Sequence, residues 1–457
     1  MALSLSRNAT LYLSTVESSW DGTGSSLKDA NTFEIPILDG FSFSQATGTQ
    51  NVTLNEAGTA PRRGQKIFNT SLEPVDWSFT TYVRPFKDTA DSSKHSCTEA
   101  LLWNGLVSNA KSDYTGNGLS NDTTDLSIDF ETSEAANQLL KMYGYFRFSD
   151  SGLTYKLSKM CVTSASIDFD IDGIAQISWS GYASAMEEVG VTYPDTAGTD
   201  FVAAQTDADF ILNRLSTVSL SSDLDAATGG RVTAIGSVTA GSGYTSVPTA
   251  VFTAAPTGGR TAKGTATISV GGAVTGVTIT DSGAGYTTGP TISFTGGGGT
   301  GASVAACTIV KTAVTYDFAL TGGNVTIDNG ITYVMPEELG KINTPIDHQV
   351  GTRAISGNFT AYLDSSSTGT KGIYDDMKTD LDSVAPDATN SFNIDLNIGG
   401  TVAGEPQVQF SMGQAHFELP TIDTSDVMGV TMNFTALETD FAGEDELTIN
   451  YKGKTVT

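Results

Sequence analysis

The sequence predicts a mainly β protein with two tandem β-sandwich or β-barrel domains, each flanked by a helix, and a small all-β domain inserted in the second. Three observations support this fold class. Apolar and polar residues alternate with a period of two through most of the chain. A short Gly-rich repeat occupies the middle, and a longer repeat becomes visible once that middle is set aside.

Length and charge limit the possible classes of protein. The chain has 457 residues, which corresponds to about three domains at roughly 150 residues each. Its 51 acidic and 24 basic residues give a net charge of −27. Such a chain is expected to repel nucleic acid, whose phosphates require Lys and Arg, and to stay away from anionic membranes.

The N-terminal "MALSLSRNATLYLSTV" alternates like a strand and lacks the continuous apolar run of a signal peptide. No run of about 18 apolar residues predicts a membrane helix. The three cysteines, Cys97, Cys161 and Cys307, are odd in number and match no metal spacing. We therefore expect reduced thiols in a protein that folds in a cytosol.

Strands are predicted where alternation is clearest, in "LYLSTV", "FEIPIL", "WSFTTYV", "YGYFRFS", "SIDFDIDG", "AQISWSG", "NVTIDN", "NFTAYL", "SFNIDLNIG" and "VTMNFTAL". A helix is predicted in 96–108, where Ser96 and Glu99 have capping-box spacing and Leu102 and Leu106 share one face. A second is predicted in 372–383 from the spacing of its apolar residues Ile373, Met377 and Leu381. A third, shorter candidate covers 133–142.

The small repeat predicts a compact module. "VTAIGSVTAGSGYTSVPTAVFT" from residue 232 matches "VTGVTITDSGAGYTTGPTISFT" from residue 274. Each copy reads as a strand, a Gly-rich turn, a Tyr, a Pro-set turn and a second strand. The "TGGGGTG" that follows lacks the Gly-Lys-Ser/Thr ending of a nucleotide-binding loop, which favours a plain turn.

The large repeat predicts a duplicated domain. "DWSFTTYV" and "GNFTAYL" align Phe79 with Phe359, Thr80 with Thr360 and Tyr82 with Tyr362. A predicted helix and a closing hairpin follow in each half. The predicted domains are therefore 1–205, then 206–227 joined with 311–457, with the module at 228–310 inserted in a loop, where insertions are tolerated.

"DFDIDG" places three carboxylates, Asp168, Asp170 and Asp172, with the spacing of a calcium loop. Such a loop needs a Glu at its twelfth position, which here is Trp179. The alternation of Phe169 and Ile171 with the acids instead favours a strand with one acidic face, closed by an Asp-Gly hairpin turn.

No catalytic site is predicted. His95 is expected in a Ser-rich loop, and none of His95, His348 and His416 lies near a nucleophile-elbow motif. Pairs of carboxylates are expected among 51 acidic residues, so their presence is no specific evidence for a hydrolase. We expect a protein that is not an enzyme, with no cofactor and no metal.

The stretch "NEAGTAPRRGQK" is different, because it gathers three bases in an acidic chain. It includes Asn55, Glu56, Arg62, Arg63 and Lys66 and joins two predicted strands. One reading is a solvated loop. The other is an arm that docks on an acidic partner surface, where complementary charge sets the register and the association rate.

The segment "VTLNEAGTAPRRGQKIFNTSLEPVDWSFTTYVRPF", the duplicated halves and "GGNVTIDNGITYVMPEELGKINTPI" resemble the major tail tube proteins of long-tailed, siphovirus-type bacteriophages, in the duplicated-domain form. The resemblance implies homotrimeric, pseudo-sixfold rings that self-assemble in the host cytoplasm and stack into a tube, which conducts DNA during ejection in the virion tail. The duplicated form favours a sheathless tail, but the presence of a sheath stays open. It implies contacts with tape measure, tail terminator and tail tip proteins, none with membranes, and no specific DNA binding.

The same resemblance implies that the loop with Arg62 and Arg63 contacts the next ring. Its counterpart in the second half, "PEELGKINTPIDHQVGTR", is shorter and less basic, so equal bridging by both halves stays open. Asp168, Asp170 and Asp172 are candidates for an acidic lumen that repels phosphate. The Gly-rich module would block the channel if it pointed inward, so we expect it on the outer surface.

An alternative is a carbohydrate-binding, adhesin-like protein whose binding face is the Gly-Tyr-Pro module. Tyr244, Tyr286, Phe252 and Phe294 could stack on sugars. Because they occupy matched positions in both repeats, filling the module's own core is the simpler interpretation.

Overall fold

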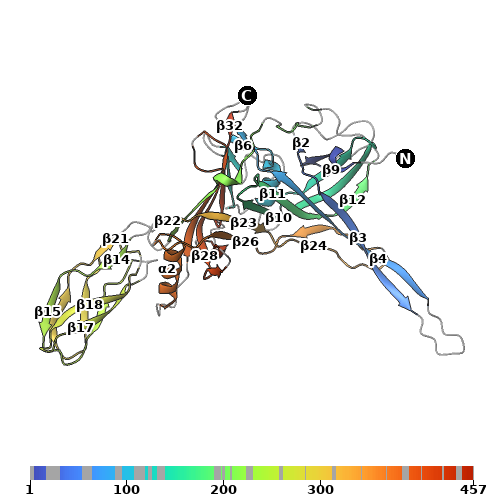
Figure 1. Cartoon of the computed structure of the whole chain (residues 1–457). Helices are drawn as coiled ribbons and strands as arrows, with labels where there is room; N and C mark the ends of the chain where they lie inside the picture. The colour runs from blue at the N-terminus through green and yellow to red at the C-terminus, as the bar shows by residue number, and fades with distance from the viewer. Residues whose placement is uncertain are drawn as a thin grey trace.

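The computed structural model describes most of the chain, in these ranges: 5–16, 31–53, 64–87, 95–107, 119–121, 126–130, 139–189, 197, 201–205, 208–222, 230–256, 261–283, 285–310, 315–340, 342–366, 368–382, 391–402, 404–424, 427–438 and 445–455. The protein is mainly β, as predicted, with its strands joined in a barrel-like system of sheets (Figure 1).

The first half of the chain, outside the Gly-rich module, is a series of antiparallel strands in the spatial order β2-β1-β9-β10-β11-β4-β3. The short β12 lies beside the beginning of β10, and the 3-10 helix η1 (Ser6–Asn8) precedes β1. The strands of this first series are β1 (Ala9–Ser14), β2 (Thr32–Ile35), β3 (Ser42–Thr53), β4 (Gln65–Tyr82), β9 (Met142–Phe148), β10 (Leu153–Asp170), β11 (Gln176–Ala183) and β12 (Ala185–Glu188).

The second half repeats this order as β22-β13-β27-β28-β30-β26-β23. Here β31 lies beside β28 as β12 lies beside β10, and η3 (Asn213–Leu215) precedes β13. The strands of this second series are β13 (Thr217–Ser222), β22 (Thr315–Tyr316), β23 (Leu320–Asp328), β26 (Ala354–Tyr362), β27 (Ser391–Ile398), β28 (Gln407–Phe417), β29 (Thr421–Asp423), β30 (Gly429–Ala436) and β31 (Thr448–Lys452).

Shorter strands tie the C-terminal end of the chain back to the first half. β31 pairs with β8, and β32 pairs with β5 in parallel. The strands of these connections are β5 (Pro85–Lys87), β6 (His95–Cys97), β7 (Leu119–Asn121), β8 (Leu126–Asp129) and β32 (Lys454–Thr455). A separate two-stranded sheet is formed by β24 (Thr332–Val334) and β25 (Asp347–Gln349).

β10 is the corner of the first sandwich. Its first part pairs with β9 and β12, and its later part pairs with β11 and β23. The register shifts between Leu157 and Met160, and Lys159 between them has φ 52°, a backbone conformation unusual for a residue with a side chain. The kink lets β10 pair with strands of both sheets of the sandwich, and such a bent strand closes a sandwich at its corner.

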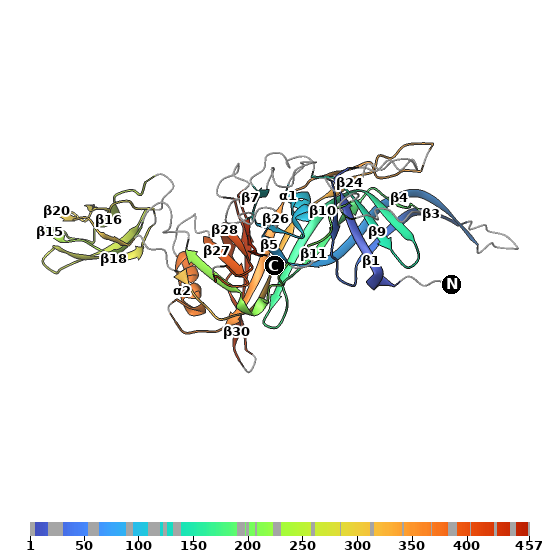
Figure 2. The same ribbon diagram turned by 90° about the horizontal axis from the view of Figure 1, so that it is seen from above.

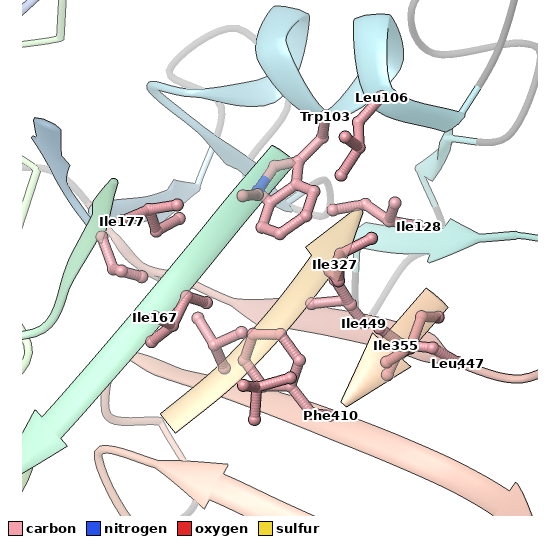
Figure 3. Close-up of a cluster of buried hydrophobic side chains, with 14 of the residues drawn as sticks. Trp103, Leu106, Ile128, Ile167, Ile177, Ile327, Ile355, Phe410, Leu447 and Ile449 are labelled. Carbon is pink, nitrogen blue, oxygen red and sulfur yellow. The ribbon is translucent and has the colours of Figure 1, made fainter. Parts of the chain in front are cut away.

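One hydrophobic core spans both halves. Trp103 lies 4.9 Å, centroid to centroid, from Trp179 of the first half. Figure 3 shows Trp103 and Ile167 gathered with Ile355 and Phe410 of the second half. Because this apolar cluster is continuous, the two halves bury their surfaces together.

The two helices differ from each other. α1 (Ala100–Val107) begins after Glu99, and all eight of its residues are buried. The predicted capping box is wrong, because Ser96 belongs to strand β6. Leu102 and Leu106, which were predicted to share one face, are both buried, and so are the other six residues of the helix, with β10 and β8 packed against it.

α2 (Thr370–Asp382) buries Ile373 and Met377 and exposes Tyr374, as its spacing predicts. The third helix candidate is not seen where it can be judged, because Leu139 and Leu140 are in irregular structure and Met142 begins β9. The first six residues of that candidate lie outside the described part of the chain.

The Gly-rich module lies between β13 and β22, the connection that joins β1 to β2 in the first series. It has its own hydrophobic cluster and a six-stranded sheet in the order β15-β20-β19-β16-β17-β18, with β14 and β21 paired at its base. Its strands are β14 (Arg231–Ala234), β15 (Val238–Ser242), β16 (Thr249–Phe252), β17 (Lys263–Ile268), β18 (Val274–Asp281), β19 (Ile292–Thr295), β20 (Thr300–Val304) and β21 (Thr308–Val310).

The two repeats of the module are interleaved. β15 of the first repeat pairs with β20 after the second, and β18 of the second pairs with β17 after the first. Gly241 and Gly283 hold matching turns at φ 62°. A Cβ on Gly241 would lie 2.6 Å from the carbonyl oxygen of Thr300, so this turn requires glycine.

Candidate functional site

A continuous polar face covers the sheet in the middle of the molecule. It runs over six neighbouring strands, β4, β11, β10, β23, β26 and β30, and crosses from the first half to the second at the β10–β23 pair. Along each strand the core-facing residues alternate with residues on this face. The face is therefore a joint product of both halves.

Small hydroxyl and amide side chains form rows across the polar face. Ser166 lies opposite Thr326 across the β10–β23 joint, with their hydroxyl oxygens 3.1 Å apart. In the next row Asp168 lies opposite Asn324, whose side-chain oxygen accepts a hydrogen bond at 3.1 Å from the Asn358 amide. Short polar groups that bond to one another give a smooth surface with few projecting charges.

The charged groups on the polar face are acidic. Asp168 and Asp170 are exposed on β10, and Asp76 and Asp328 are exposed on β4 and β23. No Lys or Arg occurs in described residues 72–82, 164–170, 176–183, 320–328, 354–362 or 429–436, which make up these six strands here. A negative potential over this face follows from that composition.

Asp172 lies beyond the end of β10, in the turn to β11. Its carboxylate is 3.7 Å from the Arg214 guanidinium, and both side chains are exposed. Trp179, at the position where a calcium loop needs Glu, is buried and donates a hydrogen bond to Thr81 Oγ1 at 2.9 Å. The structure thus has the predicted strand and hairpin here.

β3 and β4 extend beyond the body as a long hairpin, called here the arm (Figures 1 and 2). Their pairing continues to Thr53 opposite Gln65. Lys66 is exposed on the arm. The other predicted contact residues of the loop, Asn55, Glu56, Arg62 and Arg63, lie outside the described residues.

The equivalent segment of the second half runs beside the arm. The backbone of Asn343 pairs with β4 in parallel: its carbonyl accepts from Leu72 N at 2.8 Å, and its N–H donates to Thr70 O at 3.3 Å. Its sequence lacks strand alternation, so residue patterns did not reveal this contact.

Two of the three histidines are buried in short strands. His95 belongs to β6, not to a loop, and its Nδ1 accepts a hydrogen bond from Gly453 N at 2.7 Å. His348 Nε2 accepts from Leu139 N at 3.0 Å, and burial holds the pKa of this imidazole below its ordinary value. Each imidazole accepts a hydrogen bond from a backbone N–H of a distant segment, and so ties two segments together.

A buried carboxyl joins the first half to the C-terminal strand. Burial raises the pKa of Glu99 to about 7, although Thr98 Oγ1 donates to Glu99 Oε2 at 2.8 Å. Trp103 Nε1 donates to the Tyr451 hydroxyl at 2.7 Å. Since Tyr451 also hydrogen-bonds to Glu99, these groups form one network at the top of α1.

Two aromatic residues of the module, Tyr286 and Phe252, are buried in its own hydrophobic cluster, and Phe294 packs against that cluster. Tyr244 is buried beside the glycine turn at Gly297 and Gly299. The Tyr286 hydroxyl accepts from Ala262 N at 2.9 Å and donates to Thr253 O at 3.1 Å. The sugar-stacking face needed by the adhesin alternative is therefore not formed by these side chains.

No helix among the residues described above is long and apolar enough to cross a bilayer. No protein-family model matches the chain. The sequence is 26% identical to the tail tube protein pb6 of Escherichia phage T5, over 99% of this chain and 77% of that protein. This similarity over nearly the full chain supports a tail tube protein of the long-tailed, siphovirus type, which is a structural component of the virion tail and not an enzyme.

Proposed function

We propose that three copies of the chain close into a pseudo-sixfold ring, and that stacked rings form a tube whose acidic lumen conducts DNA. The observation that carries this proposal is the joint inside the chain, where β10 of the first half pairs with β23 of the second. The same joint, repeated between copies, would generate a ring.

Each half contributes one edge of its sheet to the joint, β10 from the first half and β23 from the second. The counterpart of each of these edges, in the other half, is open. The counterpart of β23 in the first half is β3, and the counterpart of the later part of β10 in the second half is β29. Among the described residues, β3 pairs only with β4, and β29 pairs only with β30. An open edge at each end of a sheet favours head-to-tail association, which closes when the rotation fits.

The matching ladders define the register of the proposed joint. In the first half, Ser166 lies opposite Ser178 of β11, and Ser178 lies opposite Thr80 of β4. In the second half, Thr421 lies opposite Thr431 of β30, and Thr431 lies opposite Thr360 of β26. Since Thr80 and Thr360 are equivalent, Thr421 corresponds to Ser166.

The other strand of the joint is aligned in the same way. Ser44 of β3 lies opposite Asp76 of β4, and Thr326 of β23 lies opposite Ser356 of β26, the equivalent position of the second half. Ser44 therefore corresponds to Thr326. The hydroxyl pair Ser166–Thr326 inside the chain becomes the hydroxyl pair Thr421–Ser44 between copies.

A ring closed in this way places the polar face on the inside. Its carboxylates and its lack of Lys and Arg in the described strands would repel DNA phosphates and let the duplex slide. Asp168 and Asp170 are our lumen candidates. Asp172 belongs to the turn at the ring's edge, and contacts with tape measure, terminator and tip proteins are expected at the tube's interior and ends.

The proposed ring is tested with a cysteine pair, Ser44→Cys with Thr421→Cys. We expect disulfide-linked dimers and closed trimers under mild oxidation, because the two edges meet only between copies. Ser44→Cys with Thr435→Cys is the matched control, since Thr435 lies on the same face but on the inner strand β30. Ring formation without crosslinking in the first variant would contradict this joint.

A further inference from the structure

The two helices of the chain are covered to different extents, although they hold equivalent places in the duplicated body. α1 follows β4 and α2 follows β26, the two strands on which Thr80 and Thr360 correspond. All eight residues of α1 are buried. On α2, Lys371, Tyr374 and Lys378 are exposed, and their spacing of three and four residues places them on one helix face. Something therefore covers α1 that a single copy does not supply to α2.

The second half supplies part of the cover of α1. Trp103 Nε1 of α1 donates to the Tyr451 hydroxyl of β31 at 2.7 Å, and Asn329 Nδ2 donates to the carbonyl oxygen of Leu106 at 2.9 Å. Figure 3 shows Trp103 and Leu106 in one apolar cluster with Ile449 of β31. In Figure 2, α1 lies in the middle of the molecule, between the strands of the two halves. α1 is thus held at the boundary between the halves, with β31 packed against it.

The strand ladders show which residues of the two halves correspond. Leu13 of β1 and Leu220 of β13 correspond, because each lies opposite the second residue of a matched segment, "TFEIP" in β2 and "TYDFA" in β22. Across β9 the ladder from Leu13 reaches Leu157 of β10, and across β27 the ladder from Leu220 reaches Met412 of β28. Leu157 and Met412 therefore correspond as well.

β12 of the first half is the counterpart of β31, and Glu188 takes the place of Ile449. Two residues before the matched positions of β10 and β28, Tyr155 lies opposite Glu188 and Phe410 lies opposite Ile449. Ile449 is fully buried, but Glu188 is exposed. β12, like α2, is therefore exposed where its counterpart is covered.

A ring of equivalent halves brings these two exposed surfaces together. Inside the chain, α1 of one half packs with β31 of the half that follows. In the ring, the second half of one copy is followed by the first half of the next, so the same packing joins α2 to the neighbour's β12. The side on which α2 lies agrees, since it is on the part of the second half away from the first (Figure 2). One contact between copies would then cover both surfaces.

The side chains on the two surfaces suit one another. Enclosing Glu188 as its counterpart is enclosed requires a partner for the carboxylate, since a buried charge without one is costly. The exposed face of α2 presents two ammonium groups, those of Lys371 and Lys378, on either side of Tyr374. Beside Glu188, the partly buried Met186 packs against the core. Its thioether is a favourable neighbour for an aromatic ring such as that of Tyr374.

We propose that α2 of one copy packs on β12 of the next copy in the same ring, with Tyr374 against Met186 and a lysine of α2 paired with Glu188. The proposal rests on the proposed ring. It adds a contact between a helix and a strand to the joint of β29 with β3, so that each copy holds its neighbour at two places. It also assigns a role to the exposed face of α2.

The first test is a cysteine pair, Tyr374→Cys with Glu188→Cys. Mild oxidation of assembled rings should give disulfide-linked dimers and closed trimers, because α2 and β12 lie far apart within one copy (Figure 1). Tyr374→Cys with Glu187→Cys is the matched control. It should give far less linked product, since Glu187 is the next residue of β12 and its side chain points to the opposite face of the strand.

The second test exchanges the charges. Glu188→Lys should raise the protein concentration needed for rings by roughly tenfold or more, because it brings like charges together. Adding Lys371→Glu and Lys378→Glu should restore ring formation at the lower concentration. Analytical ultracentrifugation measures both. Melting curves of the unassembled chain should change little, because all three side chains are exposed in a single copy.

The outcomes separate this contact from the ring itself. Rings that are linked through Ser44→Cys and Thr421→Cys, but tolerate Glu188→Lys and are not linked through Tyr374→Cys and Glu188→Cys, overturn the inference and leave the proposed function standing. A wild-type chain that forms no rings overturns both.

Discussion

The two halves of the tube body share a strand order but differ in their helices and in their connecting loops. α1 of the first half is buried on all sides and is tied to Tyr451, whereas α2 of the second half buries Ile373 and Met377 and exposes Tyr374. The first half carries the long arm, and the second half has a short hairpin, β24–β25, in the equivalent connection. The two halves thus share the order of their strands, while the elements around the strands differ.

The largest expected difference between the halves concerns the helices. Trp103→Ala should reduce the free energy of unfolding by about 3–5 kcal/mol, because it empties a core site and removes the partner of Tyr451. Ile373→Ala in α2 should cost about 2–4 kcal/mol. Denaturant titration measures both, with exposed Tyr374→Ala as the control near zero. Equal losses in the two helices would remove the distinction drawn between them.

The buried carboxyl of the first half should make its stability depend on pH. The folded-state pKa of Glu99 is raised from 4.5 to about 7, so its protonated form is favoured. Its stabilising contribution is complete below about pH 4.5 and is lost as the pH rises through 7, up to about 3 kcal/mol.

Glu99→Gln should therefore gain stability relative to the wild type at pH 8, and little or none at pH 4.5. Melting curves at the two pH values measure this change. A variant whose deficit or gain is the same at both values would show that Glu99 does not titrate in this range.

The arm and the second-half loop can be compared through their charges. Arg62→Glu with Arg63→Glu should leave rings but prevent their stacking, because the basic loop is expected to face an acidic surface. Glu337→Lys with Glu338→Lys in the second-half loop should change stacking much less. Electron microscopy distinguishes single rings from tubes, and unaltered tubes in the arginine variant would show that the loop does not bridge rings.

The smallest effect on the tube is expected from removing the module. Deleting 228–310 should leave rings and tubes intact, since the module has its own core and lies at the opposite end of the molecule from the arm (Figures 1 and 2). Tube diameter in micrographs should decrease. Loss of assembly would place the module in the tube wall.

Much of the fold could be predicted from the sequence, because half-buried strands alternate in a regular way. The β10–β11 hairpin followed from the alternation of Phe169 and Ile171 with acids. The buried helix α1 was identified, but its start was not, since Ser96 and Glu99 imitate a capping box while Ser96 is in a strand.

Contacts that depend on distant segments were not predictable. Nothing in the sequence around Asn343 indicates its pairing with Thr70 and Leu72. Likewise, Glu99 resembles a capping residue until Tyr451, far along the chain, is placed beside it. The pairing of Ile174 with Leu212 was missed for the same reason, because the two residues are far apart in the sequence and meet only through an isolated backbone bridge.

The interleaved sheet of the module has a consequence for inheritance. Because each repeat supplies an edge strand to the other, a chain with one repeat would lack a partner for β15 or β18 and could not close the sheet. Gain or loss of this cassette among related phages should therefore occur in one step and in pairs. Genomes that carry a single Gly-Tyr-Pro repeat in this loop should be rare.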